Sequence, residues 1–366
     1  MSARQCNRYQ NAANLYRNDR RGKRYMRKAA LIYNPVSGSQ PERRVAEVEI
    51  AAEALRAGGV NAIPIATENP GSAGDQTQRA IAAGCDAVFA CGGDGTVNEV
   101  VQGLIASRTT TALGVIPLGT ANALAHDLRI PRDPAGAARS ALTAERQKIA
   151  VGQVQCLSLD GKPITRYFVV ATGIGVDAHL FYKLNFQLKQ KHGMAAYYAQ
   201  AASLWFTHHF ASFEILFGSK DEGPRKEVVS QALAVRISQF GGVLKRLAPG
   251  AALRRDDLRL VIFKTASRVP YILYVLGRFL EQEWRVPGVE LADTTHMICR
   301  PLGPDGQPNG SDVKKRIYVE VDGELIGTLP ADISMAQDAI TLLVPQKLAT
   351  VKATANLIPA AASPSS

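Results

Sequence analysis

Short apolar runs and amphipathic segments alternate along the first third of the chain. Val45, Val48, Ala52 and Leu55 recur at helical spacing, which predicts one buried helix face. This alternation is typical of a parallel sheet, whose ligand loops lie at the carboxyl ends of the strands. The predicted strands are 29–33, 62–66, 86–89 and 113–117, and the predicted helices are 41–57, 76–83, 100–106 and a segment ending at 128.

From about residue 148 the pattern becomes β-rich, which predicts a second, mostly antiparallel domain. Its predicted strands are 149–157, 167–171, 212–217, 228–238, 258–263, 289–299 and 315–321, with helices at 177–188, 194–206 and 268–280. A last strand at 339–344 is expected to return toward the first domain. The expected division is a basic disordered arm (1–27), an α/β domain (28–145), a β-rich domain (146–350) and a disordered tail (351–366).

Charge is concentrated at the beginning of the chain. The formal net charge is +11 over 366 residues, and the first 28 residues hold nine basic residues against Asp19 alone. Two interpretations stay open: Met26 is the ordinary start, or residues 1–25 form a polybasic arm that adsorbs to anionic lipid. Because charge outside the arm is nearly balanced, nucleic-acid binding remains only a non-enzyme alternative, and no nucleic-acid partner is expected.

The cysteines and the apolar stretches bear on the compartment. Five scattered cysteines form no Cys-x-x-Cys pair, so neither a disulfide framework nor a zinc site is indicated. The longest apolar stretches, of about 12–13 residues, are shorter than a membrane span needs. We therefore expect a cytoplasmic protein.

The candidate chemistry lies in the glycine loops of the first domain. Gly92, Gly93 and Gly95 surround Asp94, and without Cβ atoms their N–H groups can approach a phosphate closely. A helix that starts at Thr96 adds a positive N-terminus, and Asp94 indicates that a cation or a proton is handled there. Two further turn-forming loops, 34–38 and 117–122, follow strands at the same sheet edge. For each loop considered alone, the alternative to an anion site is a tight strand-to-helix turn with no binding role.

Six motifs in one order give the chain a resemblance to a known family. They are Asn-Pro-Val-Ser-Gly (34–38), Gly-Gly-Asp-Gly-Thr-Val-Asn-Glu (92–99), Pro-Leu-Gly-Thr-Ala-Asn (117–122), Gly-Ile-Gly-Val-Asp-Ala (173–178), Leu-Ala-Pro (247–249) and Val-Asp-Gly-Glu (321–324). Over 28–345 the sequence resembles the diacylglycerol kinase catalytic-domain family, which includes sphingosine and ceramide kinases. The resemblance implies an α/β fold in which a Rossmann-like parallel sheet domain binds ATP. A β-rich sandwich domain would bind lipid, with the active site in the cleft between them.

The resemblance also implies roles for individual residues. Glu324 is expected to be the base, Asp94 and Asp322 are expected to bind Mg²⁺ or bridge to it through water, and Asp177 is expected to contact the lipid headgroup. Taken alone, Asp322-Gly323-Glu324 predicts a type I′ hairpin turn. The residues expected to contact ATP are Asn34, Pro35, Ser37, Gly38, Thr67, Gly92, Gly93, Asp94, Gly95, Thr96, Asn98, Glu99, Gly119, Thr120 and Asn122.

Two positions depart from the family pattern. Ala123 stands where many members have an acidic residue, and Arg254, Arg255 and Arg259 lie where some bacterial members hold a structural Mg²⁺. These arginines put that metal in doubt.

The expected function is an ATP- and Mg²⁺-dependent lipid kinase acting on a primary hydroxyl, as in diacylglycerol or a sphingoid base. An NAD kinase-like small-molecule kinase is the enzyme alternative. The expected partner is a lipid at a membrane surface, with peripheral association, and homodimer formation is left open. Whether 194–206 and 268–280 are core helices or line a lipid channel also stays open.

Overall fold

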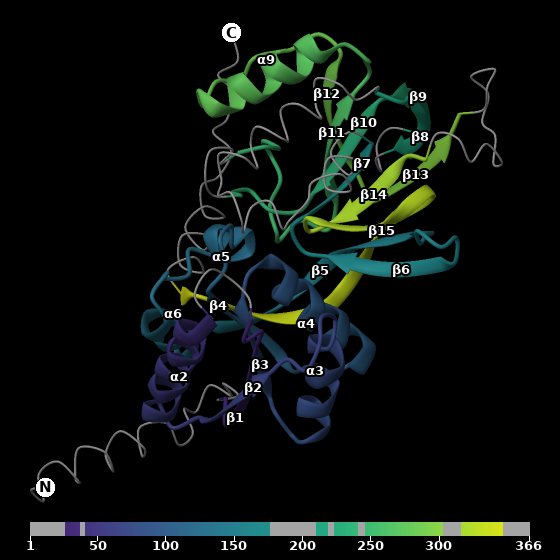
Figure 1. The fold of residues 1–366 in the computed structure, drawn as a ribbon. Helices are drawn as coiled ribbons and strands as arrows, with labels where there is room; N and C mark the ends of the chain where they lie inside the picture. Colours follow the sequence, from purple (N-terminus) through teal and green to yellow (C-terminus); the bar gives the residue numbers. More distant parts are fainter. Residues whose placement is uncertain are drawn as a thin grey trace, which may run out of the picture.

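The computed structural model describes residues 26–36, 41–175, 210–218, 223–240, 246–302 and 316–346. Their strands form one hydrogen-bonded sheet whose main path runs β12-β11-β10-β7-β14-β15-β4-β3-β1-β2. The α/β part and the β-rich part occupy opposite ends of the molecule (Figure 1). The α/β fold class predicted from the sequence is confirmed.

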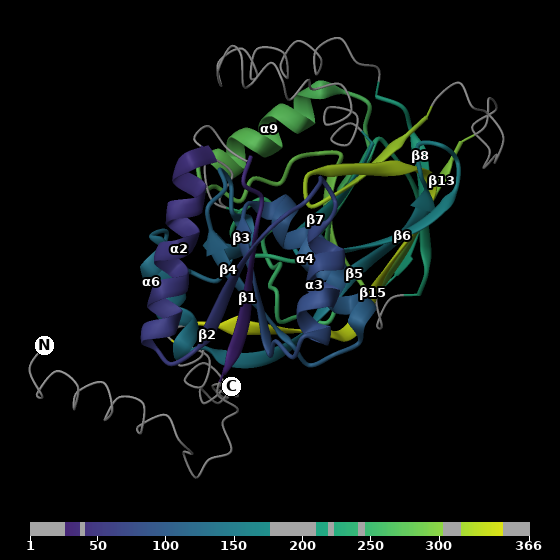
Figure 2. The ribbon, with the colours of Figure 1, turned by 60° about the horizontal axis from the view of Figure 1, so that its bottom comes forward.

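The α/β part is a four-stranded parallel sheet covered by helices on both faces. Its strands are β1 (Lys28–Tyr33), β2 (Asn61–Ala66), β3 (Ala87–Gly92) and β4 (Ala112–Pro117). Successive side chains of a strand point to opposite faces of the sheet. Leu31 therefore packs with residues of α2 on one face, and Ile32 packs with residues of α4 on the other. The helices are α2 (Pro41–Ala57), α3 (Ala73–Ala82), α4 (Asp94–Ser107), α5 (Ala123–Asp127) and α6 (Pro134–Leu142), and Figure 2 shows α2 beside α6 and α3 beside α4.

The β-rich part encloses its own apolar core between strands, and this core includes Phe168, Phe213 and Ile174, all fully buried. Its single long described helix, α9 (Arg268–Phe279), follows β11. The strands are β5 (Glu145–Leu157), β6 (Pro163–Phe168), β7 (Ala171–Gly175), β8 (Phe213–Gly218), β9 (Arg225–Val229), β10 (Gln231–Val235), β11 (Leu258–Phe263), β12 (Val289–Thr294), β13 (His296–Pro301), β14 (Tyr318–Val321) and β15 (Glu324–Val344).

The long strand β15 joins the two parts. It pairs antiparallel with β14, β13 and β5, and its last residues pair parallel with β4 through Thr341 and Ala112. The predicted return of 339–344 to the first sheet is therefore confirmed. Because β15 begins at the Asp-Gly-Glu turn, this strand connects that turn directly to the parallel sheet.

Several predicted elements differ from the structure. Strand 289–299 is two strands, because Thr294 Oγ1 hydrogen-bonds to Gly218 O and to the backbone of His296 and breaks the ladder. Segment 228–238 likewise divides at Ser230, and 167–171 divides into the end of β6 and the start of β7. Val45 is half exposed rather than buried. The predicted helices 177–188 and 194–206 lie outside the described residues. None of the described helices combines the length and the apolar character of a membrane span.

Candidate active site

The glycine loops meet at one edge of the parallel sheet. Tyr33 is in register with both Ala66 and Cys91, and Gly92 is in register with Pro117, so the four strands end side by side. The loops that follow them bring together the backbone around Asn34, Thr67, Gly93 and Gly119. Ser37 and Gly38 lie outside the described residues. Thr120 is exposed at this edge.

Two of these loops touch through their backbones. A Cβ on Gly119 would lie 2.3 Å from Gly93 Cα, so no side chain fits between the loops. Both Leu118 N–H and Gly119 N–H donate to Gly92 O, at 3.0 and 3.1 Å. Asn122 adopts the left-handed conformation (φ 52°) and exchanges hydrogen bonds with Gly119 through its amide. The loops after β3 and β4 therefore form one backbone unit, of the kind that binds phosphate.

Asp94 lies at the start of α4 and connects it to α5. Its Oδ1 accepts the Ala123 N–H at 2.8 Å. Desolvation raises the pKa of Asp94, and N–H donors at Ala123, Leu124 and Asn122 oppose that rise. The negative charge that looked out of place in a phosphate loop is thus offset by peptide N–H groups. Half-buried rather than enclosed, Asp94 remains accessible at the sheet edge.

Two further candidates on α4, Asn98 and Glu99, have side chains that contact other parts of the protein. Glu99 accepts the N–H group of Gly71 (3.2 Å), in the turn before α3, and that of Ala73 (3.0 Å), the first residue of α3. Asn98 Nδ2 donates to Tyr167 O (2.9 Å) and to Asp322 Oδ2 (3.0 Å). Both side chains hold neighbouring elements against α4, whereas the motif comparison expected both to contact ATP.

Asp322 lies in the two-residue turn between β14 and β15. The φ values of Asp322 (48°) and Gly323 (85°) are both positive, as a type I′ turn requires. The Asp322 carboxylate accepts the N–H groups of Val169 (3.1 Å), Val170 (2.9 Å) and Ala171 (3.0 Å), in addition to Asn98. Burial raises its pKa to about 6, against these four hydrogen bonds. Since a carboxylate has about four lone-pair positions, this arrangement leaves none free for Mg²⁺, contrary to the expectation for Asp322.

Glu324, the first residue of β15, faces the start of α4. A Cβ on Gly95 would lie 2.6 Å from Glu324 Oε1, so glycine is needed for this approach. Desolvation raises the pKa of Glu324, and the carboxylates of Glu99 and Asp322 raise it further, while Arg166 lowers it. Within the described part of the chain no group donates a hydrogen bond to this carboxylate. Glu324 is therefore the carboxylate at this junction that is free to accept a proton.

Comparisons with known proteins show the family of this chain. A family model described as "Diacylglycerol kinase catalytic domain" matches residues 28–154. A diacylglycerol kinase of Staphylococcus aureus (strain MRSA252) is 34% identical over 323 residues, which cover 88% of this chain and 94% of the relative. The chain belongs to the diacylglycerol kinase family. It is a phosphotransferase with an alcohol acceptor, as the sequence predicted.

Two further similarities extend over nearly the same length. Diacylglycerol kinase of Bacillus subtilis (strain 168) is 27% identical over 88% of this chain and 98% of its own. A crystal structure from Bacillus anthracis str. Sterne, titled a diacylglycerol kinase, has a TM-score of 0.61 at 17% identity and covers 88% of this chain and 98% of its own. That structure shares the fold of this kinase.

Several contacts of this kinase's candidate site carry no sequence signal. The N–H groups of 169–171 are backbone donors, so no residue type marks them. Gln102 was also missed; its side chain donates to Tyr167 O at 2.8 Å and accepts the Tyr167 N–H at 3.1 Å. A polar residue one helical turn after Asn98 was the available signal. Asp177, the predicted headgroup contact, lies outside the described residues.

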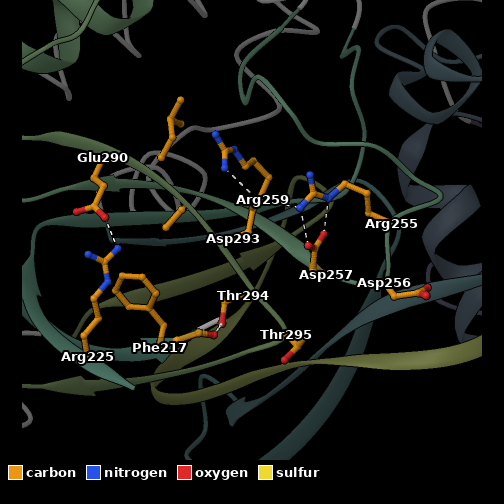
Figure 3. A pocket seen from close by; sticks show the side chains of 13 residues that line it. Phe217, Arg225, Arg255, Asp256, Asp257, Arg259, Glu290, Asp293, Thr294 and Thr295 are labelled. Atoms are coloured by element: carbon orange, nitrogen blue, oxygen red, sulfur yellow. Dashed lines mark hydrogen bonds and ion pairs between the residues drawn. The ribbon is translucent and has the colours of Figure 1, made fainter. Parts of the chain in front are cut away.

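A second polar region of the kinase lies in the β-rich part (Figure 3). It is a cavity of ≈540 Å³ between β8, β11 and β12. Arg255 donates two hydrogen bonds to the Asp257 carboxylate, at 2.6 and 2.5 Å. Asp293 forms ion pairs with Arg255 at 3.1 Å and with Arg259 at 3.0 Å. Guanidinium groups thus supply the positive charge between these carboxylates. Among the described residues no cluster of three or more His, Cys, Asp or Glu could hold a metal ion.

Proposed function

We propose that this kinase transfers the γ-phosphoryl group of ATP, with Mg²⁺, to the hydroxyl of a membrane lipid such as diacylglycerol. The observation that carries the proposal is the approach of the Glu324 carboxylate to Gly95 at the start of α4. A proton acceptor thereby stands beside a backbone unit suited to phosphate. The names of the relatives support an acylglycerol acceptor, and a sphingoid base is the other acceptor to be tested.

Glu324 acts as the general base in this proposal. An alcohol that attacks a phosphoryl group must lose its proton, and a positioned carboxylate within hydrogen-bond reach accepts it. The raised pKa of Glu324 makes it a better proton acceptor than an ordinary glutamate, provided that the pH keeps it ionised. The hydroxyl would therefore lie between Glu324 and the phosphate held at the glycine loops.

The residues present fit ATP with Mg²⁺. Gly93 and Gly119 let the two loops touch through their backbones, and the N-terminus of α4 favours an anion. Mg²⁺ in kinase sites needs one or two carboxylates besides the phosphates. Asp94 accepts the Ala123 N–H through Oδ1 and is only half-buried at the sheet edge, so it is our candidate ligand. When bound, the ion would neutralise charge on the phosphates.

Asp322 acts as a positioning residue. Its four hydrogen bonds attach the turn that precedes Glu324 to two places. Asn98 attaches the turn to α4, and the N–H groups of 169–171 attach it to the start of β7. The orientation of the base therefore depends on contacts made between the two parts of the molecule.

The test is transfer of label from γ-labelled ATP to a panel of lipids in mixed micelles, with and without a chelator. We expect label on an acylglycerol or a sphingoid base, lost on chelation and lowered by about 10²-fold or more in Asp94→Asn. Label on nicotinamide dinucleotides instead, or Asp94→Asn turnover equal to wild type, would overturn the assignment.

A further inference from the structure

Helix α5 begins at the loop after β4 and ends against the β-rich part. At its start, Asn122 exchanges hydrogen bonds with Gly119, and the Ala123 N–H donates to Asp94 Oδ1 at 2.8 Å. Its last residue is Asp127. Figure 1 shows α5 at the boundary between the parallel sheet and the β-rich part. The helix therefore connects the glycine edge to the β-rich part.

One carboxylate oxygen of Asp127 binds a segment of the β-rich part. Oδ1 accepts the Ser238 N–H at 2.9 Å, the Ser238 hydroxyl at 2.6 Å and the Gln239 N–H at 3.0 Å. We call these three hydrogen bonds the Asp127 contact. Bonds to an ionised acceptor are the strong ones among protein hydrogen bonds. Because the donors are 111 and 112 positions away in the chain, the contact forms only when both parts are folded together.

The segment that Asp127 binds lies beside the backbone that holds Asp322. It continues β10, in which Val235 is in register with Ala171 of β7. The Arg236 N–H then donates to Val170 O at 2.9 Å. Val170 and Ala171 are also the residues whose N–H groups donate to Asp322 Oδ1. The Asp127 contact therefore reaches the Asp322 turn through two neighbouring backbone segments.

Two separate routes thus connect the glycine edge to the Asp322 turn. One runs along α4 from Asp94 to Asn98, which donates to Asp322 at 3.0 Å. The other runs from Asp94 along α5 to Asp127 and then to the segment 235–239. Two parts joined at one place can pivot about it, whereas links on two different elements fix their distance and their orientation. Transfer of a group between bound reactants depends on such alignment, and an error of about 1 Å can cost about 10²-fold in rate.

We propose that Asp127 is a positioning residue of this kinase, which holds the acceptor side of the site in line with the phosphate side. The inference rests on the proposed function, because it takes Glu324 as the base and the glycine loops as the phosphate site. Asp127 acts through Ser238 and Gln239 rather than on a reactant. It also lies outside the six sequence motifs, since the third of them ends at Asn122.

The kinetic test compares variants of the full chain. Asp127→Ala removes all three bonds, so kcat for a lipid acceptor should fall by about 10-fold, while the Kd of ATP with Mg²⁺ stays within about twofold of wild type. Asp127→Asn should recover most of the lost kcat, because its amide oxygen can accept the same bonds. Ser238→Ala should cause a smaller fall and add nothing in the Asp127→Ala background. Equal kcat in Asp127→Ala and wild type would overturn the proposal.

Asp133→Ala is the matched control for a loss of stability. Asp133 Oδ1 accepts the Gly136 N–H at 2.6 Å and caps α6, within the α/β part. Loss of this cap should lower the midpoint of thermal unfolding and leave kcat unchanged. If Asp133→Ala lost as much kcat as Asp127→Ala, general destabilisation would explain both losses, and the positioning role would be rejected.

Hydrogen exchange gives a readout that does not depend on activity. The N–H groups of 169–171 donate to Asp322 and not to Asp127. In Asp127→Ala without nucleotide, these amides should exchange about 10-fold faster, whereas Asp133→Ala and Asp127→Asn should leave them near the wild-type rate. If wild type phosphorylates no lipid, the proposed function fails, but exchange still tests whether Asp127 supports the Asp322 turn. Unchanged exchange at 169–171 in Asp127→Ala would overturn the inference, because Asp127 would then anchor only Ser238 and Gln239.

Discussion

Two turns face each other at the candidate site, and they are built at different ranges along the chain. The Asp94 turn belongs to one strand-turn-helix unit, and its Ala123 donor is 29 residues away. The Asp322 turn takes its donors from residues 151 to 224 positions away. The phosphate side can therefore form within the α/β part, whereas the base side requires both parts to be folded together.

The same contrast separates the roles of the two aspartates. Asp94 is half-buried at an edge open to ligand, while Asp322 is nine-tenths buried and fully occupied by protein donors. We expect Asp94 to matter for charge in the reaction and Asp322 to matter for the stability and placement of Glu324. Substitutions at the two turns should reveal this difference.

The largest expected effect is on Glu324. Glu324→Gln should lower kcat by about 10²- to 10⁴-fold, because the amide cannot accept the hydroxyl proton. The Kd of ATP should stay near the wild-type value, since the base belongs to the acceptor side. Steady-state kinetics and nucleotide titration give the two quantities.

Asp332→Asn is the matched control, because it removes an exposed carboxylate from the same strand. Its kcat should equal that of wild type. If Glu324→Gln lost ATP binding and kept its kcat, Glu324 would belong to the nucleotide side and the contrast between the turns would be reversed.

The next effect is a difference between the two aspartates: one substitution should mainly lower stability and the other should mainly lower kcat. Asp322→Asn leaves one oxygen for four donors, and buried unsatisfied donors should lower the free energy of unfolding by about 2–4 kcal/mol. Asp94→Asn should cost about 1 kcal/mol or less, because that site is half exposed, yet it should lower kcat more than Asp322→Asn does. Chemical denaturation and kinetics on the same samples measure both. Equal stability losses at the two positions would contradict the distinction.

Gly95→Ala tests the approach between the turns. The added Cβ would meet Glu324 Oε1 at 2.6 Å and push the base away, so kcat should fall by about 10-fold with little change in ATP affinity. Gly223→Ala is the control, because a Cβ there meets nothing within 4 Å and its φ is not positive. A Gly95→Ala enzyme with wild-type kcat would mean that Glu324 acts from another position.

The local elements could be predicted from the sequence more fully than the site. The helix Pro41–Ala57 and the strand Leu258–Phe263 have the predicted bounds, because a proline is favoured at the first position of a helix and a short apolar run is typical of a buried strand. Helix α6 was missed because its segment is short and consists mainly of small residues, although Asp133 before Pro134 was a usable start signal. Asn98 and Glu99 are adjacent in the motif but about 100° apart on the helix, so they reach different neighbours, which no motif reveals.

The smallest expected effect is a shift in the pH profile. Glu324 must be ionised to accept a proton, and its raised pKa places the acid limb of kcat/KM above that of an ordinary glutamate. After desolvation, the carboxylate of Glu99 is the first cause of that rise. Glu99→Gln removes this charge, so the pKa of Glu324 should fall and the acid limb should move to lower pH.

The direction of this shift is what distinguishes an electrostatic effect from a structural one. The amide introduced by Glu99→Gln would keep one oxygen as an acceptor for the N–H groups of Gly71 and Ala73, so the fold should persist. Thermal unfolding checks this. Asp75→Asn, in the first turn of α3, is the control and should leave the limb in place. Arg166→Gln should move it to higher pH, because Arg166 lowers the pKa of Glu324. If neither Glu99→Gln nor Arg166→Gln moved the acid limb of kcat/KM, a group other than Glu324 would be the proton acceptor.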